Sequence, residues 1–96
     1  GRILCYTLDM GMDFKDSADR HGIPRRDTMY VILHPVAAQE IAGHPGETTM
    51  VYVGHPHAQT ERYVEVIAAI RPPRDLVIFH SMPLTDLYRH LLHERK

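Results

Sequence analysis

The sequence predicts a single α+β domain: two short N-terminal helices, an antiparallel sheet of about four strands, and an amphipathic C-terminal helix packed on the sheet. Two helix-like segments come first, β-rich stretches separated by turns follow, and an apolar stripe of helical spacing closes the chain. Short connections favour antiparallel pairing, because a parallel crossover needs a dozen or more residues. The 96 residues are enough for one core and too few for two domains.

The N-terminal part of the chain predicts two helices behind a short leading segment. Residues 1–12 contain alternating apolar side chains and are expected to form an edge strand or a tail laid over the core that begins at residue 13. Residues 13–20 predict a first helix, which Gly22 can end in a left-handed conformation. Pro24 suits the first turn of a second helix, and Pro35 ends it.

The middle of the chain predicts the sheet. Residues 36–41, 48–53, 62–70 and 76–80 are rich in β-branched and aromatic side chains, and turn residues separate them. Residues 71–74, which contain two prolines, predict the turn of the last hairpin. The sequence therefore predicts a meander of four strands.

The C-terminal segment carries the clearest helical pattern. Its apolar residues recur at helical spacing, and they are Leu84, Leu87, Tyr88, Leu91 and Leu92. We expect this stripe to cover the sheet. The strand residues expected beneath it are Val64, Val66, Leu76 and Ile78.

Composition limits the class of protein. Cys5 is the only cysteine, so neither an internal disulfide nor a zinc site built on several cysteines is possible, and a reducing cytoplasmic setting is expected. No apolar run is long enough to cross a bilayer, and we expect no membrane insertion and no signal peptide. The net charge is −1 with neutral histidines, which permits nucleic-acid binding without favouring it.

Three stretches within residues 14–92 together resemble one protein family. They are residues 17–23 followed by Arg26 and Asp27, residues 62–70, and residues 78–84 followed by Tyr88 and Leu91. In this order and spacing they are similar to the BrnT-like proteins, which lie near the RelE-like toxins of toxin–antitoxin pairs. The resemblance is to a short actinobacterial or phage-encoded branch. It implies a toxin-like ribonuclease with a cognate antitoxin. No cofactor is expected.

The resemblance also implies which residues would cleave RNA. Attack by a 2′-hydroxyl needs a general base, a general acid and positive groups that hold the phosphate. His21 and His80 lie in the family-like stretches and would transfer protons, while Arg20 and Arg62 would bind phosphate. A plainer interpretation stays open, in which His21 caps the first helix and His80 is a core residue.

Other histidines and surface residues suggest further roles. His55 and His57 share a loop, with His44 in an earlier turn, but this loop holds no third ligand, so no physiological metal site is expected. Tyr88 and Arg89 on the last helix are candidates for binding a partner, as is a free edge at residues 48–53.

Two functions therefore remain open from the sequence. The first is a toxin-like intracellular growth inhibitor of the BrnT/RelE type that cleaves RNA. The second is a protein without enzymatic activity that binds and disables a host protein. The resemblance favours the first, and the near-neutral charge favours the second.

Overall fold

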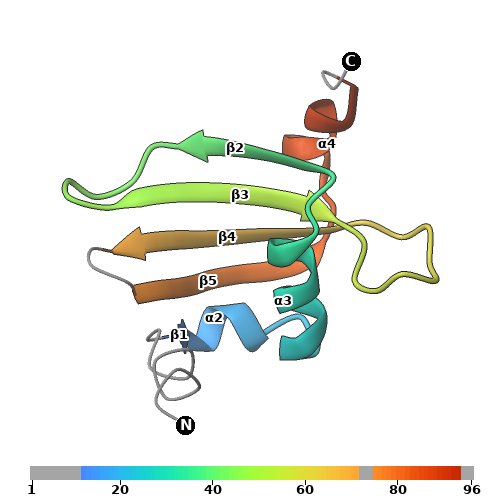
Figure 1. The fold of residues 1–96 in the computed structure, drawn as a ribbon, viewed down its shortest axis with the longest axis horizontal. Coiled ribbons are helices and arrows are strands. Elements are labelled where there is room, and N and C mark those ends of the chain that lie inside the picture. Colours follow the sequence, from blue (N-terminus) through green and yellow to red (C-terminus); the bar gives the residue numbers. More distant parts are fainter. Residues whose placement is uncertain (1–11, 72–74, 94–96) are drawn as a thin grey trace, which may run out of the picture.

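The computed structural model describes residues 12–71 and 75–93 (Figure 1). The predicted edge strand or tail of residues 1–12 and the predicted turn of residues 71–74 therefore lie largely outside the described residues. In chain order the elements are β1 (Met12–Phe14), α2 (Asp16–Asp19), α3 (Arg25–Leu33), β2 (Ala37–Ile41), β3 (Thr48–Gly54), β4 (Val64–Arg71), β5 (Asp75–Pro83) and α4 (Asp86–His93). The predicted α+β class, with a C-terminal helix, is confirmed. No helix in these ranges is long and apolar enough to cross a membrane.

The sheet has five strands in the order β1-β5-β4-β3-β2 and is mixed (Figure 1). Strands β2 to β5 pair antiparallel as a meander, but β1 pairs parallel to β5. The prediction of about four antiparallel strands is therefore too simple. Met12 was expected to end the leading segment, and Asp13 and Phe14 to begin the first helix, but all three pair with β5. The helix is shortened to the four residues of α2.

The prediction that residues 48–53 form a free edge of the sheet is wrong. Strand β2 pairs along nearly the whole of β3, with Ala37 opposite Val53 and Ile41 opposite Thr49. Among the described strands, β2 and β1 are the edges (Figure 1). A partner segment that adds to the sheet would therefore meet β2 or β1 rather than β3.

Helices α2 and α3 cover one face of the sheet. The fully buried residues of this half of the core are Ala18, Val31, Val64, Val66, Ala68 and Ile78. A buried hydrogen bond of 2.6 Å between the hydroxyls of Thr28 and Ser81 ties α3 to β5 within this layer. The face is therefore sealed by apolar packing and by one satisfied polar pair.

Helix α4 covers the opposite face, which corrects the predicted packing. Leu91 packs with Val51 and Val53, and the flanking residues of this cluster include Ile67 and Tyr88. The strand residues predicted to lie beneath α4 are covered by α2 and α3 instead; they are Val64, Val66, Leu76 and Ile78. Strand β4 is apolar on both faces, so its alternation does not show which face receives which helix.

Leu87 also departs from the expected packing. Its side chain is 69% exposed, whereas Leu91 is 5% exposed. Successive helical residues turn by about 100°, which places Leu87 at the margin of the arc formed by Leu84, Tyr88, Leu91 and Leu92. Helix α4 contacts only β2 and β3 among the described strands with several residues each, so the side of the helix that carries Leu87 is left uncovered.

The corner between α2 and α3 is fixed by local chemistry. Gly22 adopts φ of 74°, the left-handed conformation that lets the chain leave α2. Arg25 donates two hydrogen bonds to the Asp19 carboxylate, at 3.2 and 2.7 Å, and its guanidinium lies 4.7 Å from the centre of the Phe14 ring. The hydrogen bond from Arg25 lowers the pKa of Asp19. These contacts hold the segment containing His21 beside the sheet.

Candidate functional site

A β-bulge in the last strand orients His80. Ala68 pairs with Ile78, whereas the preceding residue Ile67 pairs with His80, so Phe79 is an extra residue in β5. Such a bulge switches the alternation of the strand. His80 therefore shares the sheet face of Ile67, under α4, while Ile78 stays in the core beneath α2 and α3. A strand without the bulge would place His80 on the face of Ile78, whereas His80 is half-buried on the opposite face.

The partner of His80 is the buried carboxylate of Glu65, which is not among the site residues predicted from the sequence. Glu65 is 2% exposed, and its Oε2 lies 2.8 Å from Nε2 of His80. Its other oxygen, Oε1, accepts hydrogen bonds from the backbone N–H and the hydroxyl of Thr85, at 2.7 and 2.6 Å. Glu65 thus links β5 to the residue that precedes α4. The one sequence signal for it was a charged residue within an apolar strand.

This arrangement defines the chemistry that His80 can perform. A carboxylate only accepts hydrogen bonds, so Nε2 of His80 carries the proton in the 2.8 Å contact. In the neutral ring, Nδ1 then holds a lone pair and can accept a proton. The imidazole side chain is 27% exposed, which leaves it accessible from solvent. His80 is therefore an oriented base whose positive form faces a negative charge.

His21 lies next to His80. The centres of the two rings are 6.1 Å apart and the rings meet edge to face. Helix α2 is held at the bulge, because the Ser17 hydroxyl donates to the Phe79 carbonyl and the Lys15 N–H donates to the Ile78 carbonyl at 2.9 Å. The structure thus brings together the two histidines selected from sequence, although 58 residues separate them.

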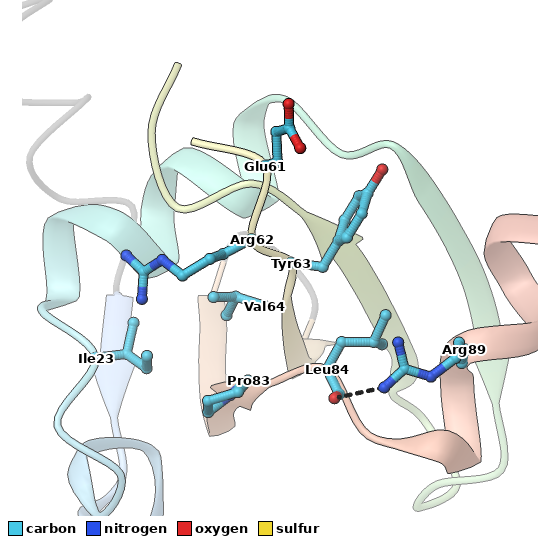
Figure 2. A pocket seen from close by; sticks show the side chains of 8 residues that line it. All are labelled: Ile23, Glu61, Arg62, Tyr63, Val64, Pro83, Leu84 and Arg89. Atoms are coloured by element: carbon cyan, nitrogen blue, oxygen red, sulfur yellow. Dashed lines mark hydrogen bonds between the residues drawn. The ribbon is translucent and has the colours of Figure 1, made fainter. Parts of the chain in front are cut away.

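The arginines selected from sequence lie in two places. Arg20 is exposed at the end of α2, directly before His21. Arg62 is exposed and lines a shallow pocket of about 360 Å³ together with Arg89 (Figure 2). The remaining lining residues are Ile23, Glu61, Tyr63, Val64, Pro83 and Leu84. The histidine pair does not line this pocket.

The His55–His57 loop is held by local contacts. Nδ1 of His55 lies 2.8 Å from the carbonyl oxygen of Arg62, and the His55 ring stacks on Tyr63 with the centres 4.5 Å apart. Nδ1 of His57 accepts from the N–H of Gln59 at 3.3 Å. Over residues 12–71 and 75–93, no three side chains of the kinds that bind metals gather at one point.

The two residues selected for partner binding differ in accessibility. Tyr88 is half-buried and packs in the cluster around Leu91. Arg89 is exposed, donates to the Asp86 carboxylate at 3.1 Å and lies 3.4 Å from the Leu84 carbonyl oxygen. Of the two side chains, Arg89 is the more accessible to a partner.

We expect the Thr85 hydroxyl to stabilise the fold through Glu65. The change Thr85→Val removes the hydroxyl at nearly constant volume and should lower the free energy of unfolding by about 1.5–3 kcal/mol, because a hydrogen bond to a buried charge is lost. Thr85→Ser keeps the hydroxyl and is the matched control. Urea unfolding of the three proteins measures the difference, and equal stability of the Val and Ser variants would contradict the assigned bond.

The chain was compared with protein families, curated proteins and solved structures. No family model, no curated protein and no solved structure matches the chain.

Proposed function

We propose that the protein is a toxin-like inhibitor of cell growth, of the BrnT/RelE type, that acts inside the cell by cleaving RNA. The observation that carries the proposal is the contact of 2.8 Å between His80 and the buried Glu65, with the His21 ring beside it. A base oriented by a carboxylate, next to a second imidazole, supplies the two proton-transfer groups of phosphodiester transesterification.

The reaction would run by internal attack within the RNA. Nδ1 of His80 takes the proton of a ribose 2′-hydroxyl, and the 2′-oxygen forms a bond to phosphorus. The bond from phosphorus to the 5′-oxygen breaks, and His21 donates a proton to that leaving oxygen. The products are a 2′,3′-cyclic phosphate and a 5′-hydroxyl. Glu65 acts as a positioning residue, because it holds the His80 ring and opposes the positive charge that His80 gains.

Two arginines would stabilise the negative charge at phosphorus. Arg20 is adjacent to His21 in the chain and is exposed. Arg62 lines the pocket described above. Guanidinium groups bind phosphate oxygens through two parallel hydrogen bonds, which is why these two arginines are assigned to phosphate binding.

The mechanism is tested by comparing RNA with DNA. Purified protein is incubated with a single-stranded RNA and with DNA of the same sequence, in the presence of a metal chelator. We expect cleavage of the RNA alone, with cyclic phosphate ends, because DNA lacks the attacking hydroxyl. Cleavage of both strands, or of neither, would overturn the proposal.

A second function is favoured by one observation on α4. Leu87 is 69% exposed and lies on the same helix as the exposed Arg89. Arginine is enriched among the anchors of protein interfaces, and an exposed leucine adds apolar area that a partner can bury. Leu87 and Arg89 are two positions apart and lie on different sides of the helix. The second candidate is therefore a protein without enzymatic activity that binds a host protein through exposed side chains of α4.

A further inference from the structure

The pocket between Arg62 and Arg89 lies at the end of the strands that carry Glu65 and His80. Val64 in its floor precedes Glu65, and Leu84 precedes Thr85, so two pocket residues adjoin the network that holds His80. Pro83, opposite Val64 in the sheet, follows His80 by three residues, which corresponds to about 10 Å along a strand. The pocket therefore lies farther along the same two strands than His80, where β4 begins and β5 ends.

The pocket has an apolar floor and positive sides. Figure 2 shows Val64, Pro83 and Leu84 between the two arginines, with the Arg62 guanidinium on the side of Ile23 and Arg89 on the opposite side. The Glu61 carboxylate points away from the floor (Figure 2). Arg89 is partly engaged by Asp86, while Arg62 makes no ion pair with any side chain among the described residues. Arg62 is therefore the stronger candidate to bind an anion.

These features match one chemical class of ligand. An unpaired base presents flat apolar faces that stack on guanidinium planes and apolar side chains, and its flanking phosphates carry negative charge. The volume of about 360 Å³ is at the lower end for ligand pockets, which suits one nucleotide and is too small for a duplex. The positive groups on opposite sides of the floor can meet the phosphates on either side of that nucleotide.

We propose that this pocket binds one unpaired nucleotide of a single-stranded RNA, adjacent to the nucleotide whose 2′-hydroxyl faces His80. The choice of RNA rests on the proposed function, whereas the binding of an unpaired nucleotide rests on the pocket. Arg62 binds the phosphate that lies toward Ile23, and the base lies on the floor.

The test uses a probe that cannot be cleaved. Binding of a 2′-O-methyl RNA trinucleotide to the full chain is measured by calorimetry, and backbone amide shifts of Val64 and Leu84 are followed by NMR. We expect shifts at both amides. Arg62→Ala should weaken binding about tenfold or more and reduce the dependence of affinity on salt by about one phosphate contact. Arg26→Ala is the matched control, because Arg26 is 88% exposed and lies outside the pocket.

The outcomes separate the pocket from the catalytic proposal. Equal affinity of the Arg62→Ala and Arg26→Ala proteins, or equal binding of a duplex, would overturn the pocket assignment, even if RNA is still cleaved. Thermal melts of both variants identify any loss of fold, and the NMR shifts of the unmodified protein test the location independently. If RNA is not cleaved but the trinucleotide binds as expected, the pocket stands and the catalytic proposal fails.

Discussion

Replacing His80 with alanine is expected to lower the rate of RNA cleavage by about 10²–10⁴-fold, the usual cost of losing a general base. Glu65 holds Nε2 of His80 at 2.8 Å, so the change removes a ring that the fold orients. His21→Ala should have a comparable effect, because the leaving oxygen then lacks its acid. Rates are measured on a defined RNA under single-turnover conditions.

The matched control is His93→Ala. His93 is exposed at the end of α4 and belongs to neither the histidine pair nor the pocket. Its removal changes the histidine content equally but should leave the rate unchanged. Thermal melts establish that all three variants are folded. A His80→Ala protein that cleaves RNA at the rate of the His93→Ala protein would refute the assigned role.

The same variants divide the two candidate functions in cells. If the protein cleaves RNA, growth arrest and RNA decay should both disappear in the His21→Ala and His80→Ala proteins. If it binds a host protein instead, growth should stop with intact RNA in both variants. In that case Leu87→Ser and Arg89→Ala should relieve the arrest, because they remove the exposed apolar and charged anchors of α4.

The sequence predicted elements with strong local signals and missed those fixed by distant contacts. Helix α3 begins directly after Pro24 and ends two residues before Pro35, so local backbone chemistry was sufficient there. The β-rich stretches gave β2 to β5 for the same reason. Strand β1 has three residues, and its pairing partner in β5 lies more than 60 residues away. No local sequence pattern therefore predicts this parallel edge strand.

The packing of α4 could not be assigned from periodicity. Val64 and Val66 lie on one face of β4, and Glu65 and Ile67 lie on the other. Because apolar residues occupy both faces, a period of two identifies a buried strand without identifying the helix above each face. The face that receives α4 depends on the connection from β5 into the helix.

The candidate site could be predicted only in part, because residue types are visible in the sequence and strand register is not. His21 and His80 were selected as residue types that transfer protons, and the fold places their rings side by side. The bulge at Phe79, which turns His80 toward Glu65, depends on the register of two strands and has no signal in a single sequence. Glu65 was visible only as a charge inside an apolar strand.

The change Leu91→Ala is expected to lower the free energy of unfolding by about 2–5 kcal/mol, the usual cost of truncating a buried leucine. Leu91 is 5% exposed and contacts the cluster of Val51 and Val53, so its loss leaves a cavity between α4 and the sheet. Urea unfolding followed by circular dichroism measures the change.

Leu87→Ala is the matched control for this last prediction. It removes the same atoms from the same helix, but Leu87 is 69% exposed, so the stability should change by no more than about 0.5 kcal/mol. The difference between the two variants therefore measures burial and is independent of helix propensity. Equal losses would mean that α4 packs through Leu87 as well, and the exposed surface proposed for partner binding would then not exist.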